Sequence, residues 1–155
     1  MGDRLEYLKS ARERLRDLHE GGDDEFLVSP IYETDPVGCA PGTEAFLNAV
    51  IQLKLDREPE DILDLTQAIE CSLGRPGQRP RNAPRTIDLD LLYCGETTME
   101  TERLILPHPR LSERRFVLVP LLNLGRSIPG FETLDAILPQ LPPDEAEPRL
   151  FAKHW

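Results

Sequence analysis

Residues 81–95 read RNAPRTIDLDLLYCG, and this stretch combines the pattern of a β-strand with two acidic residues. Apolar side chains alternate with polar ones after the threonine, which predicts a strand over residues 86–94 with one apolar face. Asp88 and Asp90 share the other face, about 7 Å apart along the chain. Aspartate is depleted in strands and a buried carboxylate needs a partner, so this pair is a candidate functional site.

Two like charges on one strand face repel each other unless a positive group lies between them. Mg²⁺ prefers carboxylate oxygens and is commonly completed by substrate phosphates, and two acids can also bridge two metal ions. The alternative is that both carboxylates are exposed and form ion pairs with surface arginines. The aspartate pair alone leaves both interpretations open.

Arginines surround the predicted strand and favour a polyanionic ligand. Residues 71–115 hold eight arginines against six acidic residues, although the net charge of the whole chain is −10. Guanidinium groups match phosphate oxygens in bidentate fashion, and a metal-binding strand between arginine-rich loops is what phosphoryl-type transfer needs. No GxxxxGK[ST] or GxGxxG motif is present, and an acidic chain repels bulk nucleic acid. From charge alone, a solvated and salt-bridged surface remains the competing interpretation.

Outward from this stretch, the periodicity predicts an α+β fold with an antiparallel sheet and helices packed on one face. The chain forms one domain, 1–155, with a proline-rich surface tail from about residue 139. Asp3 is expected to cap the first helix, Pro30 to mark an edge or bulge, and Pro59 to begin the second helix. The expected elements are a helix over 3–20, strands over 25–34 and 46–56, a helix over 59–73, loops over 35–45 and 75–85, and a short helix near 134–138.

Composition excludes several classes of protein. No apolar run approaches the roughly 18 residues of a membrane span, and the start of the chain lacks the apolar core of a signal peptide. Three cysteines, Cys39, Cys71 and Cys94, form no CxxC pair and suggest no disulfide framework. We therefore expect reduced thiols in a cytoplasmic protein that has neither a membrane nor a nucleic-acid partner.

Two motifs, GRPGQRPRNAPRTIDLDLLYCG (74–95) and ERLILPHPRLSERRFVLVPLLNL (102–124), closely resemble the 6-hydroxymethyl-7,8-dihydropterin pyrophosphokinase family of folate biosynthesis. The resemblance extends from Gly2 to about Ile137. It implies a ferredoxin-like α+β fold, and we expect the protein to be a monomer. It also implies ATP and two Mg²⁺ ions, and transfer of the β,γ-pyrophosphate of ATP to the hydroxymethyl group of the pterin with release of AMP.

The resemblance also implies roles for individual residues. A flat pterin ring is expected to stack between Phe46 and Phe116, while Asn48 offers both a donor and an acceptor to the ring edge. No side chain is assigned as a general base, and the loops 35–45 and 75–85 are expected to close over the substrates. The implied sites are metal binding by Asp88 and Asp90; catalysis by Arg75 and Arg85; ATP binding by Gln67, Glu70, Arg75, Arg81, Arg103, Ile105, His108 and Arg114; and pterin binding by Thr34, Val37, Phe46, Asn48 and Phe116.

Some positions depart from the family pattern. Asn82 stands where some members carry an aromatic residue, and Asp35 replaces a common proline. Family members open with a strand and turn of the type AYIALGSNLG before DRL, and that strand lies between the strands here expected over 46–56 and 86–94. We therefore expect an N-terminal truncation. A truncated or degenerate member that only binds nucleotide or a partner is the alternative function. A metal-dependent nuclease is a third interpretation, which the acidic surface disfavours.

Overall fold

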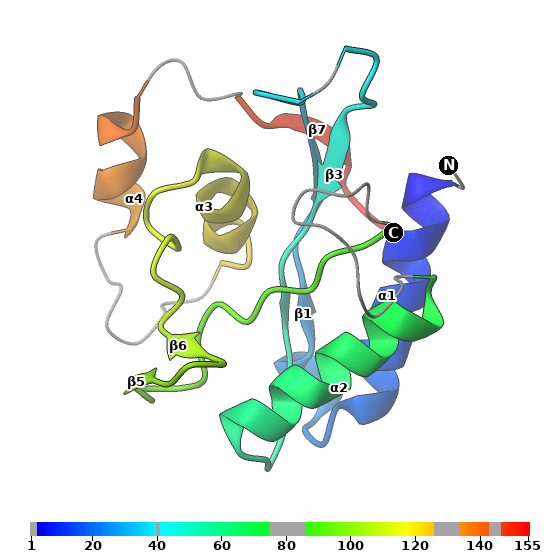
Figure 1. Ribbon diagram of the computed structural model, residues 1–155, viewed down its shortest axis with the longest axis vertical. Helices are drawn as coiled ribbons and strands as arrows, with labels where there is room; N and C mark the ends of the chain where they lie inside the picture. The colour runs from blue at the N-terminus through cyan, green and yellow to red at the C-terminus, as the bar shows by residue number, and fades with distance from the viewer. Residues whose placement is uncertain (1–2, 40, 75–85, 126–133, 143–146) are drawn as a thin grey trace.

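The computed structural model describes residues 3–39, 41–74, 86–125, 134–142 and 147–155, which form antiparallel strands between two pairs of helices (Figure 1). Helices α1 and α2 lie on one side of the strands, and α3 and α4 lie on the other. The α+β prediction is confirmed, but the prediction that helices cover one face is wrong, because α3 contacts β2 and β3 from the second side. The helices are α1 (Arg4–Leu18), α2 (Pro59–Ser72), α3 (Arg115–Leu122) and α4 (Leu134–Ile137), with 3₁₀ turns at Asp23–Glu25 and Leu138–Gln140.

The strands are short and form three antiparallel groups in the described part of the chain. β2 lies between β3 and β7, β1 pairs with β4, and β5 pairs with β6. Ser29 and Val50 join the first two groups, because the Ser29 N–H donates to the Val50 carbonyl at 2.9 Å and the Val50 N–H donates to the Ser29 hydroxyl at 2.9 Å. The strands are β1 (Leu27–Val28), β2 (Ile31–Thr34), β3 (Phe46–Asn48), β4 (Ile51–Gln52), β5 (Met99–Glu100), β6 (Ile105–Leu106) and β7 (Arg149–Ala152).

The two predicted strands 25–34 and 46–56 are each divided into two shorter strands. Pro30 separates β1 from β2, because proline has no N–H to donate to a ladder. A register shift between β2 and β7 follows it at Ile31 and Tyr32. Pro30 therefore marks an irregular point in the sheet, as its position in the sequence predicted.

The first two helices begin as the sequence predicts. The Asp3 carboxylate accepts a hydrogen bond from the Leu5 N–H at 2.9 Å, and Pro59 occupies the first turn of α2. α1 buries Ala11 and Leu15 against Ile69 of α2, which places both helices around one apolar cluster. None of the described helices has the length and apolar character needed to cross a membrane.

The predicted strand 86–94 is not a strand. The segment is extended, but within the described residues it pairs with no strand, so it lacks the ladder that defines one. Its backbone instead bonds elsewhere: the Leu89 N–H donates to the Glu70 carboxylate at 2.7 Å, and the Leu92 carbonyl accepts from the His108 N–H at 2.7 Å. The segment crosses the molecule, with Ile87 buried in the cluster of α1 and α2 and Leu92 packed against the cluster of α3 and α4.

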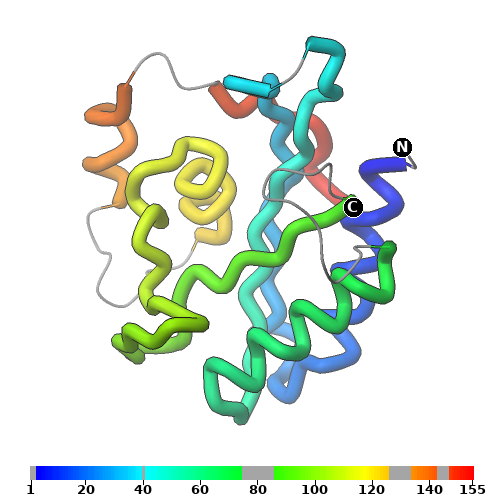
Figure 2. Tube along the Cα trace, viewed as in Figure 1, coloured from blue at the N-terminus to red at the C-terminus, as the bar shows by residue number. Residues whose placement is uncertain are grey.

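The C-terminus contributes a strand where the sequence predicted a surface tail from about residue 139. β7 pairs antiparallel with β2, with Arg149 opposite Glu33. Trp155 then donates its indole N–H to the Ser29 carbonyl at 2.8 Å, and the guanidinium of Arg12 lies 5.2 Å from the centre of its ring. Figure 2 shows the result, with the C-terminal segment beside α1 near the start of the chain. The last residues therefore extend the sheet.

Candidate active site

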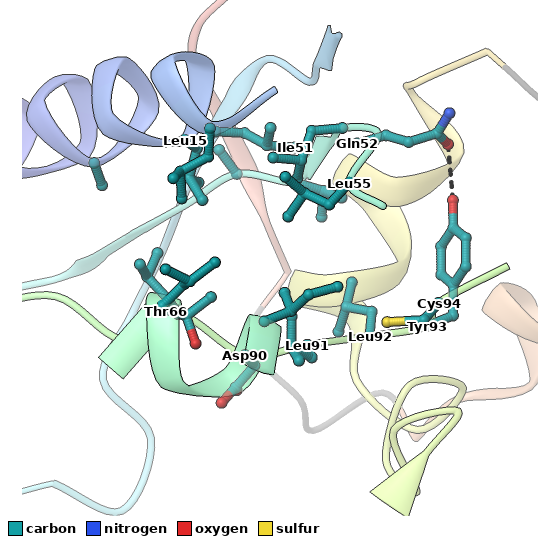
Figure 3. A pocket seen from close by; sticks show the side chains of 18 of the residues that line it. Leu15, Ile51, Gln52, Leu55, Thr66, Asp90, Leu91, Leu92, Tyr93 and Cys94 are labelled. Atoms are coloured by element: carbon teal, nitrogen blue, oxygen red, sulfur yellow. Dashed lines mark hydrogen bonds between the residues drawn. The ribbon is translucent and has the colours of Figure 1, made fainter. Parts of the chain in front are cut away.

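Asp88 and Asp90 lie on one exposed face of the extended segment, as the alternation predicted. Both residues are exposed, whereas Ile87 between the loop and the pair is 7% exposed. In Figure 3 the Asp90 carboxylate points away from the leucines that face one another across the pocket. Two carboxylates on one face are the donor set that Mg²⁺ prefers. The described residues contain no group of three or more His, Cys, Asp or Glu side chains able to hold a metal, so phosphates and water would complete any such site.

Glu70 anchors the segment that carries the two aspartates. Its side chain is buried, with 3% of the residue exposed, and Oε1 accepts the hydrogen bond from Leu89 N–H at 2.7 Å. Leu89 is the residue between Asp88 and Asp90, so this bond fixes the backbone from which both carboxylates project. This structural role of Glu70 was not predicted from the sequence. The available signal was its position directly after Ile69, on the side of α2 that is buried.

A pocket of about 860 Å³ brings together residues predicted for the metal and for the pterin. Its walls include α1, α2, the start of α3 and the segments 47–55 and 88–95. Figure 3 shows Leu15, Ile51 and Leu55 on one side, facing Thr66, Leu91 and Leu92 on the other. The predicted site residues in its lining are Asn48, Phe116, Asp88 and Asp90. The other predicted residues that the structure describes lie outside this lining.

The residues predicted for the pterin edge lie at the end of the β2–β3 pair. Thr34 pairs with Phe46, and the Asn48 side-chain amide donates to the Thr34 hydroxyl at 3.0 Å. Thr34, Phe46 and Asn48 share one face, because side chains opposite one another in an antiparallel pair point to the same side. Thr34 is buried, whereas Phe46 is 47% exposed. Val37, in the loop that follows β2, is 66% exposed.

Among the residues predicted to bind ATP, His108 has a side chain held in a defined orientation by a hydrogen bond. Its Nδ1 accepts a hydrogen bond from the Arg110 N–H at 3.0 Å, so in the neutral ring Nε2 carries the hydrogen and is a donor. The guanidinium of Arg114 lies 5.5 Å from the centre of the Phe116 ring. A residue predicted to bind the phosphates of ATP therefore lies beside a residue predicted to bind the pterin.

Arg103, also predicted to bind ATP, forms ion pairs with α2. Its guanidinium bonds to the Asp64 carboxylate and lies 3.5 Å from a carboxylate oxygen of Glu60. The hydrogen bond and charge of Asp64 raise the pKa of Arg103 above its ordinary value. Of the other predicted ATP residues, Gln67 is exposed on α2 and Ile105 of β6 is 42% exposed. Arg75, Arg81 and Arg85, including both predicted catalytic arginines, lie outside the described residues.

Comparison with known proteins adds independent evidence. The sequence model of a family described as 7,8-dihydro-6-hydroxymethylpterin-pyrophosphokinase (HPPK) matches residues 1–126. The chain is 43% identical to 2-amino-4-hydroxy-6-hydroxymethyldihydropteridine pyrophosphokinase of Bacillus subtilis over 129 residues, which cover 83% of this chain and 74% of that protein. It is 44% identical to the Pseudomonas aeruginosa protein of the same name over 98 residues, 63% of this chain and 59% of the relative.

A longer relative is the folate synthesis bifunctional protein of Arabidopsis thaliana. It is 36% identical over 124 residues, which cover 80% of this chain and 25% of that protein. The similarity in this relative is therefore confined to about a quarter of its length.

Proposed function

Because this chain belongs to the 7,8-dihydro-6-hydroxymethylpterin-pyrophosphokinase family, we infer that it is the pyrophosphokinase of folate synthesis. The reaction transfers the β,γ-pyrophosphate of ATP to the hydroxymethyl group of 6-hydroxymethyl-7,8-dihydropterin and releases AMP. A degenerate member that only binds nucleotide is disfavoured, because the relatives that carry the pyrophosphokinase name match most of this chain. A monomeric enzyme in the cytoplasm remains a prediction of the sequence.

One observation supports the proposal most directly. The pocket lining contains Asn48 and Phe116, the residues suited to a polar aromatic ring, together with Asp88 and Asp90, the residues suited to a metal. Transfer between two bound substrates depends on holding the acceptor and the phosphates close together in a defined geometry. Residues of both sets therefore border the same region of the molecule, as such a reaction needs.

The aspartate pair fits Mg²⁺ because both carboxylates are exposed on one face of a segment that Glu70 fixes. Asp88 and Asp90 would hold the metal, and two Mg²⁺ ions would neutralise charge on the phosphates of ATP.

For the pterin, Asn48 orients the ring edge, with its amide held by the Thr34 hydroxyl, and Phe116 and Phe46 offer aromatic faces to the ring. Val37 would approach the ring from the loop after β2. The acceptor is thereby oriented with its hydroxymethyl group toward the phosphates, which is the main contribution that a protein makes to this type of transfer.

For ATP, His108 donates from Nε2 to a phosphate oxygen and Arg114 supplies positive charge beside Phe116. Arg75 and Arg85 would stabilise charge that develops during transfer. We propose the remaining ATP contacts at Gln67, Glu70, Arg81, Arg103 and Ile105. Positive charge from the arginines of this set lowers the barrier because it stabilises phosphate charge in a site from which water is excluded.

We also propose that the sheet becomes ferredoxin-like when one further extended segment lies in the apolar part of the pocket, with the exposed Asp88 and Asp90 outside it. The pocket has walls of extended backbone at 47–55 and 88–95 and contains apolar side chains of α1 and α2, such as Leu15 and Ile62. Protein interiors contain few voids larger than a water molecule, so the part of this pocket that lies between apolar side chains is suited to being filled. A chain extended at its N-terminus by a strand and turn should have a higher melting temperature than this chain. An unchanged melting temperature would contradict the added strand.

The activity is tested by incubating the purified protein with ATP, Mg²⁺ and hydroxymethyldihydropterin and by measuring nucleotides chromatographically. AMP is expected only when all three are present, and chelation of Mg²⁺ with EDTA should stop its formation. If AMP forms without the pterin, the protein is a hydrolase. If no AMP forms in a chain extended by the proposed strand, the inferred activity is wrong.

A further inference from the structure

The loop between β2 and β3, residues 35–45, is held at both of its ends by arginines from distant parts of the chain. Arg149 of β7 donates two hydrogen bonds, each 2.8 Å long, to the two carboxylate oxygens of Asp35, the first residue of the loop. Arg4 of α1 donates to the carbonyl of Ala45, the last residue of the loop. The two arginines come from opposite ends of the sequence.

Glu33 connects these two contacts. One of its carboxylate oxygens lies 3.3 Å from the guanidinium of Arg4, and the other lies 3.8 Å from the guanidinium of Arg149. Glu33 and Arg149 are also opposite each other in the β2–β7 register. We use the name loop clamp for Arg4, Glu33, Asp35 and Arg149.

The loop clamp adjoins the residues proposed for the pterin. Asp35 directly follows Thr34, whose hydroxyl accepts the bond from Asn48, and Ala45 directly precedes Phe46, which pairs with Thr34. The loop therefore leaves the sheet directly after Thr34 and returns to it directly before Phe46. A change in the position of Asp35 is expected to move the neighbouring Thr34. Arg149 lies beyond Ile137, to which the resemblance in the sequence extends, and it was not among the residues predicted for the site; the family match ends earlier, at residue 126.

We propose that Arg149 is a positioning residue for the pterin, which acts by holding Asp35 and thereby the start of the loop beside Thr34 and Asn48. The proposal rests on the proposed function and adds a residue to its pterin site. Two parallel N–H to oxygen bonds give a fixed orientation as well as attraction, which a lysine cannot reproduce. The hydrogen bonds from Arg149 also lower the pKa of Asp35 below its ordinary value.

The pair is exposed, so its main effect is local. Asp35 and Arg149 have side-chain exposed fractions of 61% and 55%, and exposed ion pairs contribute little to global stability. A pair of this kind nevertheless shifts a loop equilibrium by about three- to fivefold, which is enough to change the apparent affinity for a ligand that needs one loop position. The expected consequence is therefore a change in pterin binding without a comparable change in melting temperature.

The test compares Arg149→Gln, Arg149→Lys and Asp35→Asn with Lys9→Gln, a control that removes an exposed ion pair of α1 with Glu6 at 3.0 Å. In the three clamp variants the KM for the pterin should rise about three- to fivefold, while the KM for ATP stays within twofold. The control should change neither constant. Exchanging the two charges, with Asp35→Arg and Arg149→Asp together, should recover part of the pterin affinity.

Arg149→Lys separates positioning from simple charge, because lysine keeps the charge and loses the bidentate geometry. Equal rises in both KM values, or a pterin KM within twofold of the unmodified protein in Arg149→Gln, would overturn the proposal while leaving the enzyme activity in place. An unmodified protein that forms no AMP at all would instead overturn the proposed function, so the two failures are distinguishable. Circular dichroism of each variant checks that the overall secondary structure is retained, and hydrogen exchange at residues 35–39 should increase only in the clamp variants.

Discussion

Replacing Glu70 with alanine removes the side chain that holds the aspartate segment to α2. The Leu89 N–H then loses its acceptor at 2.7 Å, in a part of the molecule where Glu70 is only 3% exposed. A hydrogen bond to a charged group contributes about 1.5–3 kcal/mol to stability. For a chain of 155 residues, 1 kcal/mol corresponds to about 2–4 °C in melting temperature, so Glu70→Ala should lower it by about 3–12 °C.

Activity should fall as well, because Leu89 lies between the two residues proposed to hold the metal. Glu70→Gln keeps a carbonyl oxygen that can accept from Leu89, and so should recover at least half of the lost melting temperature. Differential scanning calorimetry and AMP formation measure the two effects separately. Glu13→Ala, at an exposed position of α1, is the control and should remain within about 0.5 kcal/mol of the unmodified protein.

The result that would refute this reasoning is equal destabilisation by the alanine and glutamine variants. That outcome would mean that the charge of Glu70, and not its hydrogen bond to Leu89, holds the segment. A melting temperature unchanged in both variants would mean that the segment is held by other contacts.

Three further predictions concern single residues. Asp90→Asn should reduce AMP formation at least 100-fold in a coupled assay, with less than about 1 kcal/mol lost in urea unfolding, because Asp90 is exposed. Asp64→Asn should lower the KM for ATP by about two- to fivefold, because it weakens the ion pair that competes for Arg103. At pH 8, Cys94 should react with iodoacetamide more slowly than Cys71, as followed by mass spectrometry, because burial raises the pKa of Cys94 and Cys71 is exposed.

Each of these predictions has an opposing result. Full turnover in Asp90→Asn would exclude the metal role, and the same loss in Glu13→Gln would show that the assay reports a general effect. An unchanged or higher KM for ATP in Asp64→Asn would mean that Arg103 does not leave α2 to bind phosphate. Faster labelling of Cys94 than of Cys71 would show that the segment 86–94 opens readily to solvent.

The alternation in residues 86–94 predicted the faces of residues 87–90 correctly and the secondary structure of the segment wrongly. Which side chains are buried depends on local periodicity, and Ile87 and Asp88 are placed as that pattern requires. A hydrogen-bonded ladder also needs a neighbouring strand. Whether such a strand is present depends on the tertiary structure and cannot be predicted from a local sequence pattern. The same limit explains why Glu70 was predicted as an ATP ligand without its bond to Leu89.

The C-terminal strand was missed for a related reason. Prolines and acidic residues after 139 are typical of a surface tail, and only four residues, Arg149–Ala152, form β7. Their pairing with β2 joins positions more than 100 residues apart, as the bond from Arg149 to Asp35 does. The starts of α1 and α2 were predictable because Asp3 and Pro59 act on residues within one turn.

Transfer of ATP that carries a radioactive label on its β-phosphate tests the central claim most directly. In a single turnover with Mg²⁺ and hydroxymethyldihydropterin, all of the transferred label should appear in the pterin product, with unlabelled AMP formed in equal amount and no ADP. Label retained in ADP would show transfer of a single phosphoryl group, and label released as pyrophosphate would show hydrolysis. Either result would contradict a pyrophosphokinase.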